Sequence, residues 1–166
     1  MEKKLKIIVL SLSTILFLSS TQASAATATT TMAVTATVLT SCLVTATPLV
    51  FGNYDPNSAT PLAATSTTTT VCTGASSYTL SMNAGAGTGA TFASRKMTFG
   101  ASTLNYSVYT TVAHTTVWGD GTAGTGQVTG TGLLGSVNNT VYGLIPAGQS
   151  PNAGAYTDSI TVTLTY

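Results

Sequence analysis

The chain has 166 residues, of which 5% are charged and 43% hydrophobic, and its formal net charge is +1. Beyond residue 25 the only cations are Arg95 and Lys96, against three aspartates, so we expect no basic surface for nucleic acid and no polybasic face for anionic lipid. Threonine, serine, alanine and glycine dominate, which favours strands joined by glycine-rich turns.

The N-terminus has the features of an export signal. Three lysines within the first six residues precede an apolar run from Ile7 to Leu18, and Ala23-Ser24-Ala25 fits a small-residue cleavage site. The apolar run is about twelve residues long, shorter than the roughly twenty that a membrane span needs. We therefore expect residues 1–25 to be removed, with an uncleaved anchor as the alternative.

Residues 26–38 alternate in the way that a half-buried strand does. Met32, Val34, Ala36 and Val38 share one face, and the intervening residues, mostly threonine, share the other. Two interpretations stay open at this point. The segment is either an ordinary first strand of the domain or a mobile extension that pairs with another molecule.

Cys42 and Cys72 are the two cysteines of the chain, and export places them in an oxidising compartment. We therefore expect them to form a disulfide, which would close a loop of about thirty residues and contribute on the order of 3–4 kcal/mol. Metal ligation is unsupported, because His114 is the single histidine and no second Cys/His cluster exists. We expect neither a metal nor another cofactor.

From Cys42 onward the sequence alternates between short β-type runs and turn clusters. Strands are expected at Ser41–Val44, Thr65–Cys72, Ser77–Met82, Phe92–Phe99, Leu104–Val112, Thr140–Ile145 and Tyr156–Tyr166, and Gly119–Gly135 is either a surface loop or a weak edge strand. About eight strands at short spacing, with no helical period longer than a turn, predict an all-β, immunoglobulin-like β-sandwich.

The last expected strand is the most regular. Ile160, Val162, Leu164 and Tyr166 share one face, and threonine and serine share the other. An apolar strand of this kind needs neighbours on both edges or some cover, yet none follows in the sequence. We therefore expect a sheet that is unfinished within one chain.

The residues that could carry catalysis are few. His114 has no acidic neighbour in the sequence, and Asp55, Asp120 and Asp158 are scattered, which gives neither a nucleophile–base pair nor a facing carboxylate pair. We therefore expect no catalytic residues and predict that the protein is not an enzyme. Arg95 is expected either to form an exposed cationic spot or to pair with an aspartate.

Trp118-Gly119-Asp120-Gly121 is the one candidate for ligand contact. An aromatic face beside a carboxylate could bind a sugar, with Trp118 and Asp120 as the contacts, although one carboxylate is too few for a calcium loop and Asp-Gly is also ordinary turn chemistry. The turn is the preferred interpretation.

Several spaced motifs together resemble the spore coat protein U domain family, which includes subunits of archaic, Csu-type chaperone-usher pili. The motifs are the Cys42 segment, Leu49–Tyr54, Val71–Gly74, Arg95–Met97, Leu104–Tyr109, Trp118–Gly121, Val141–Pro146, Gly148-Gln149 and Gly154–Asp158. The resemblance implies an incomplete immunoglobulin-like β-sandwich that lacks its last strand and is completed by a donor strand from a chaperone or a neighbouring subunit.

Mapped onto this chain, the resemblance implies a donor extension at 26–38 that inserts Met32, Val34, Ala36 and Val38, and a pilin-like domain at 39–166. Ile160, Val162, Leu164 and Tyr166 would line the acceptor groove and contact a chaperone.

The expected partners of such a subunit are a periplasmic chaperone, an outer-membrane usher and other pilin subunits, with no nucleic acid and no membrane span after signal cleavage. The expected function is that of a structural subunit of an extracellular fimbrium that supports adhesion and biofilm formation. The alternatives are a secreted domain that binds glycan through Trp118, and a spore or cell-surface coat protein.

Overall fold

The computed structural model describes residues 24–132 and 135–166, which fall into a segment ending at Thr37 and a compact domain from Val38 to Tyr166. All but the last two residues of the predicted export signal lie outside the described residues. Residues 24–41 form no strand, and the first strand of the domain begins at Cys42. No helix among the described residues is long and apolar enough to cross a membrane.

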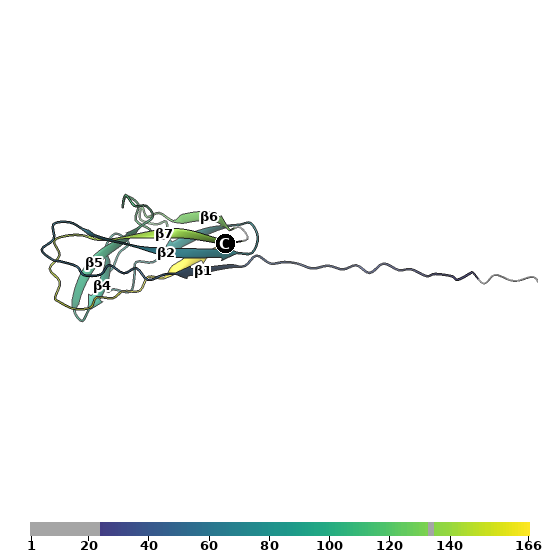
Figure 1. Ribbon diagram of the computed structural model, residues 1–166, viewed down its shortest axis with the longest axis horizontal. Coiled ribbons are helices and arrows are strands. Elements are labelled where there is room, and N and C mark those ends of the chain that lie inside the picture. Colours follow the sequence, from purple (N-terminus) through teal and green to yellow (C-terminus); the bar gives the residue numbers. More distant parts are fainter. Residues whose placement is uncertain (1–23, 133–134) are drawn as a thin grey trace, which may run out of the picture. The chain divides into compact units, whose positions relative to one another are not determined.

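The domain consists of two antiparallel sheets, which confirms the predicted all-β class (Figure 1). One sheet has five strands in the order β1-β2-β7-β5-β4, and the other has three in the order β6-β3-β8. The strands are β1 (Cys42–Ala46), β2 (Leu62–Cys72), β3 (Ser76–Met82), β4 (Arg95–Phe99), β5 (Ser102–Tyr109), β6 (Val128–Gly132), β7 (Gly135–Ile145) and β8 (Val162–Thr165).

The alternation of the sequence sets which side chains enter the space between the sheets. In β2, Ser66, Thr68 and Thr70 are buried while the residues between them are at least partly exposed. This run is almost all threonine, and it forms a long strand because β-branched side chains suit a pleated surface. Its inward hydroxyls make one end of the interior polar: Thr68 Oγ1 donates to the carbonyl of Asn139 in β7, at 3.3 Å.

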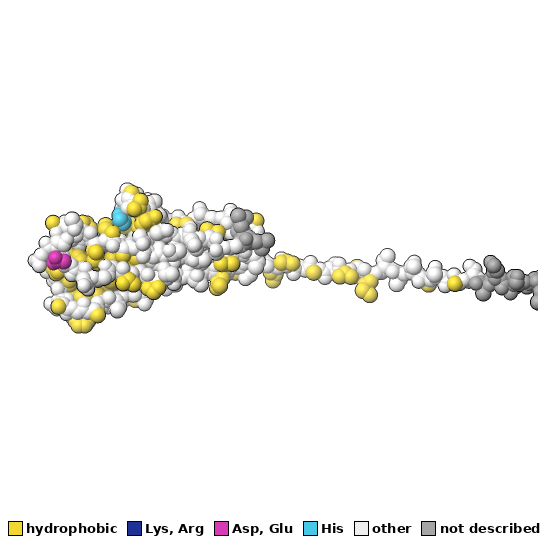
Figure 2. Space-filling view, viewed as in Figure 1, with side chains coloured by type: hydrophobic (Ala, Val, Ile, Leu, Met, Phe, Trp, Pro, Cys, Tyr) yellow, Lys and Arg dark blue, Asp and Glu magenta, His cyan; other side chains and the backbone are white. Residues whose placement is uncertain are grey.

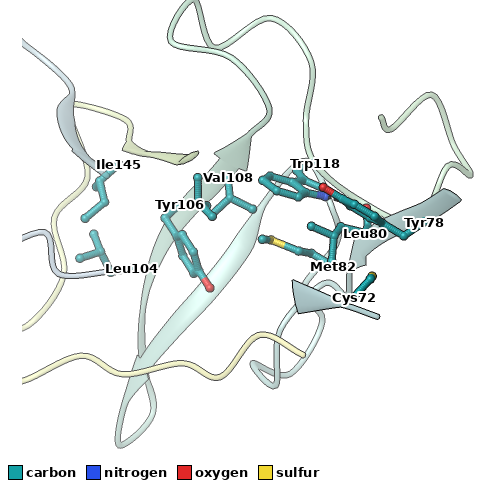
Figure 3. Packing of buried hydrophobic residues seen from close by; sticks show 10 residues of the cluster. Cys72, Tyr78, Leu80, Met82, Leu104, Tyr106, Val108, Trp118 and Ile145 are labelled. Carbon is teal, nitrogen blue, oxygen red and sulfur yellow. Dashed lines mark hydrogen bonds between the residues drawn. The ribbon is translucent and has the colours of Figure 1, made fainter. Parts of the chain in front are cut away.

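The apolar core lies between the two sheets, and Figure 3 shows its side chains. Leu80 and Met82 of β3 face Tyr106 and Val108 of β5, with Trp118 among them. The remaining buried members are Cys72, Tyr78, Leu104, Val141 and Ile145. Side chains from both sheets therefore meet in one cluster, as expected for a sandwich.

Pro48–Tyr54, which follows β1, lies against β7 at a point where the sequence has a glycine. A Cβ on Gly143 would fall 2.8 Å from the side chains of both Leu49 and Phe51. Because this contact is closer than real Cβ atoms make, the segment can approach the sheet only over a residue without a side chain. The approach gives Leu49 and Phe51 their place beside the core.

The last strand is shorter than the sequence predicted. The alternation indicated a strand from Tyr156 to Tyr166, but β8 comprises only Val162–Thr165. Thr157 pairs with Thr98 of β4 instead, so the chain leaves one sheet and joins the other within a few residues. The side-chain pattern persists through this crossing although the strand pairing does not.

Several other boundaries also differ from the prediction, by a few residues in β2, β4 and β5. β7 begins at Gly135, upstream of the expected Thr140, and extends through two asparagines that do not look like strand residues. The glycine-rich region 119–135 contains β6, which is an edge strand of the smaller sheet. The weak edge strand was therefore the right alternative for part of that region.

Candidate functional site

A groove of about 350 Å³ opens between the two sheets, beside their edge strands β1 and β8. One wall is formed by the chain that leaves β1, from Ala46 to Phe51, and the other by the chain that leads into β8, from Tyr156 to Val162. The floor contains the core residues Met82, Tyr106, Val108 and Val141, together with Met97, Ser66 and Thr68. The groove thus leads from the surface directly to the core.

The edge of β8 that faces the groove is free. The Thr161 carbonyl accepts from the Asn83 amide at 3.1 Å, and Thr163 and Thr165 pair with β3. Because alternate residues of a strand direct their backbone groups to the same neighbour, Ile160, Val162 and Leu164 direct theirs away from β3. Among the described strands, β3 is the only one that pairs with β8.

Within the described part of the chain, the edge of β1 is free in the same way. The Thr47 amide donates to the Thr67 carbonyl at 2.9 Å, and the Ser41 carbonyl accepts from the Thr73 amide at 2.8 Å, so the odd-numbered residues face β2. Cys42, Val44 and Ala46 therefore direct their backbone groups outward. β1 and β8 lie in contact, so two unpaired edges flank one groove.

The side chains predicted to line this groove lie partly there. Ile160 and Val162 are half-buried and belong to its lining, and Leu164 is half-buried against the core. Tyr166 lies outside the lining and is 56% exposed. The alternating pattern thus predicted the inward direction of Ile160, Val162 and Leu164, but not the exposure of Tyr166, which lies beyond the end of β8 at Thr165.

One end of the groove is a polar network that sequence reasoning missed. Tyr106 Oη donates to Asp158 Oδ2 at 2.7 Å, and the Ala86 amide donates to Asp158 Oδ1 at 2.8 Å. Burial, followed by the hydrogen bond to Asp158 and its charge, raises the pKa of Tyr106 far above its ordinary value. No sequence signal joins these residues, because they are distant in the chain.

Arg95 is a buried cation, contrary to both predictions made for it. Its side chain is 0% exposed, and the guanidinium donates to the carbonyls of Asn83, Phe92 and Trp118 at 2.7 to 3.0 Å. Burial lowers its pKa, and the nearby Tyr106 and Asp158 oppose that shift. Arg95 is therefore neither an exposed cationic spot nor, among the described residues, part of a direct ion pair; it links β4 to carbonyls on the far side of the sandwich.

The proposed sugar contact at Trp118 is wrong. Trp118 is 0% exposed, and its Nε1 donates to the Leu80 carbonyl at 3.1 Å. A ring that is enclosed on all sides offers no face to a ligand. Asp120 is exposed and caps its own turn by accepting from the Thr122 amide and hydroxyl, which lower its pKa, so the turn interpretation holds.

His114 lies in a tight turn with a positive φ of 52°, as expected of a polar residue beyond a strand end. Its ring makes edge-to-face contacts with Tyr109 at 5.0 Å and with Tyr142 at 6.5 Å between centroids. Asp55 accepts from the Asn57 amide in another exposed turn. Each of the three aspartates accepts hydrogen bonds in its own surroundings, from Asn57, Thr122 and Tyr106 respectively.

The disulfide between Cys42 and Cys72 is present, as the sequence predicted. It joins the first pair of opposed residues of β1 and β2, and Cys72 packs in the core. The bond therefore fastens β1, which forms one edge of the groove and pairs with a single strand.

Two comparisons with known proteins identify the family. The model of the Spore Coat Protein U domain matches residues 28–163. The chain belongs to this family. Protein U of Myxococcus xanthus is 37% identical over 130 residues, which cover 71% of this chain and 71% of that protein. The family consists of structural, non-enzymatic proteins, in agreement with the prediction that the chain is not an enzyme.

A solved structure shares the fold. It is a chain of the CsuC–CsuE chaperone–tip adhesion subunit pre-assembly complex from the archaic chaperone-usher Csu pili of Acinetobacter baumannii, with a TM-score of 0.52 and 20% sequence identity. The match covers 78% of this chain and 40% of that chain. At this identity the likeness shows the fold alone.

Proposed function

We propose that the protein is a structural subunit of an extracellular chaperone-usher pilus, assembled by donation of a strand from one copy to the next. The observation that carries the proposal is the pair of free strand edges, on β1 and β8, that flank a groove leading to the core. A strand inserted there, with β1 and β8 moved apart to admit it, would pair with both edges and cover the floor. The sandwich is then an incomplete immunoglobulin-like fold that a donor completes.

The N-terminal segment has the composition of such a donor. Met32, Val34 and Val38 are 85–90% exposed, and the outward positions between Met32 and Val38 are Ala33, Thr35 and Thr37. Figure 2 shows hydrophobic side chains exposed along the extended segment. Burying three side chains of this kind contributes about 1.5–3 kcal/mol each, before any main-chain hydrogen bond is counted. With Ala36 as the fourth inward residue, the segment offers one apolar face to the groove and one hydroxyl-bearing face to solvent.

The chain is then organised as an export signal at 1–25, a donor extension at 26–38 and an acceptor domain at 39–166. The periplasmic partner is a chaperone that fills the groove first and contacts Ile160, Val162, Leu164 and Tyr166. An outer-membrane usher and the other pilin subunits follow. That the similar solved structure is a chaperone–subunit complex supports the chaperone as a partner. The fibre would serve surface adhesion and biofilm formation.

The test is removal of the donor. A chain lacking residues 26–36 should be recovered as a chaperone-bound monomer that forms no fibres. Val34→Asp should have the same effect, because it places a charge in an apolar groove. The matched control is Thr35→Asp, which places the same charge on the outward face and should leave assembly intact. Normal fibres from the deletion, seen by electron microscopy, would refute the proposal.

A coat layer is the second candidate function, and the family description and the similarity to Protein U favour it. Strand donation would hold such a layer together in the same way. Electron microscopy of cells that express the chain with its assembly partners distinguishes separate fibres from a continuous layer.

A further inference from the structure

The chain crosses between the two sheets just before β8, at the end of the groove. Thr157 exchanges backbone hydrogen bonds with Thr98 of β4, at 2.9 and 3.2 Å, and so belongs to the five-stranded sheet. Thr161 bonds both the amide and the side-chain Oδ1 of Asn83, which follows β3, and so belongs to the other sheet. Three residues, 158–160, therefore span the sandwich at this point and lead to the free edge of β8.

The carboxylate of Asp158 holds the middle of this crossing. Oδ2 accepts from Tyr106 Oη of β5 at 2.7 Å, and Oδ1 accepts at 2.8 Å from two amides, those of Ala86 and of Ser159. The bonds reach one sheet through Tyr106 and the loop after the other sheet through Ala86. The fit is tight, since a Cβ on Gly85 would collide with the carboxylate.

Arg95 strengthens the same connection. It extends from β4 to the carbonyls of Asn83 and Trp118, at 2.8 and 2.7 Å. Asn83 is also the residue that bonds Thr161, so the guanidinium and the crossing segment hold the same point beyond β3. The positive charge of Arg95 and the negative charge of Asp158 favour each other across the interior.

We propose that Asp158, with Tyr106 and Arg95, is a brace that positions the free edge of β8 for an incoming strand while the groove is still empty. The inference rests on the proposed function and adds to it a set of positioning residues. A donor that meets a fixed edge binds at its intrinsic affinity. A donor that meets a fluctuating edge binds more weakly, in proportion to the fraction of chains with the edge in place.

The brace should affect capture of the strand and not its retention. Before capture, β8 is held on one side by β3, and its N-terminal lead is held by the Asp158 network. After capture, the donor pairs with the other side of β8 and secures it independently. Loss of the brace should therefore slow association and leave dissociation almost unchanged.

The test uses the full mature chain with Val34→Asp and Ala36→Asp, so that its own extension cannot insert, and a labelled peptide of wild-type residues 26–38. Asp158→Asn should slow association of the peptide about tenfold or more, because it removes the charge from three hydrogen bonds. Tyr106→Phe, which removes one of the three, should slow it about threefold. Dissociation should change less than about twofold in both variants. The matched control is Asp120→Asn, which removes the same charge from an exposed turn.

The outcomes separate the brace from a merely structural role. Lower thermal stability with unchanged association would overturn the proposal, as would an Asp158→Asn rate within twofold of the Asp120→Asn control. If Asp158→Asn does not fold, the Tyr106→Phe variant tests the proposal in its place. In that variant, with the groove empty, the Thr163 and Thr165 amides should exchange hydrogen faster than in the parent chain. If the parent chain takes up no peptide, the proposed function fails, and the exchange measurement alone decides whether the brace exists.

Discussion

Removal of the disulfide should loosen β1 more than any other strand, and the size of the effect follows from the chain. Cys42 and Cys72 are 30 residues apart. A cross-link over a loop of that length removes about 12 cal/mol/K of entropy from the unfolded chain, or about 3.6 kcal/mol at room temperature. In the variant with alanine at both positions, the lost burial of the Cys72 sulfur adds about 1 kcal/mol.

The measurement is urea unfolding of the oxidised chain and of the double-alanine variant. Trp118 is the single tryptophan of the sequence and is fully buried, so its fluorescence reports the global transition. The expected loss is about 4–5 kcal/mol in the free energy of unfolding. Leu43→Ser, at the exposed residue beside Cys42, is the control for local changes in β1. A loss below about 1 kcal/mol would refute the loop-closure reasoning.

Two further predictions concern the core. Trp118→Phe should lower the free energy of unfolding by about 2–4 kcal/mol, because it leaves the Leu80 carbonyl without its donor and opens a void. Urea unfolding followed by circular dichroism would measure the loss. An unchanged unfolding midpoint would contradict the contribution of the buried ring and its hydrogen bond. The pKa of Tyr106 is raised in the folded chain, so its protonated form contributes fully to the free energy of unfolding below about pH 10. Above that pH the contribution falls by up to about 1.4 kcal/mol per pH unit. Tyr106→Phe should remove this alkaline dependence from urea midpoints, whereas Tyr166→Phe, at an exposed position, should retain it.

The local pattern of the sequence was enough to predict the disulfide and the approximate position of several strands. β3 follows the expected Ser77–Met82 closely, and β2 contains the expected Thr65–Cys72 but begins at Leu62, because period-two alternation and β-branched residues act within a few positions. The predicted export and the presence of two cysteines were enough to predict the Cys42–Cys72 bond. The inward face of the last strand was also readable, through Ile160, Val162 and Leu164.

The environment of single polar residues could not be predicted in this way. General tendencies place Arg95 at the surface, and its burial depends on carbonyls 3, 12 and 23 residues away that only the fold brings together. Asp158 looked like one aspartate among three, yet its partners lie 52 and 72 residues distant. The burial of Trp118 is decided by β3, which is remote in sequence, so the sequence left a ligand contact open as the weaker alternative to a turn.

The burial of Arg95 also determines how readily proteases that cut after basic residues can cleave the folded domain. Arg95 and Lys96 are the only such residues beyond residue 25, and they stand side by side in β4. With Arg95 enclosed and Lys96 half-buried in a paired strand, neither basic side chain is free to enter the specificity pocket of such an enzyme. The domain thus carries one dibasic cleavage point, and only the opening of the sandwich at β4 makes it available.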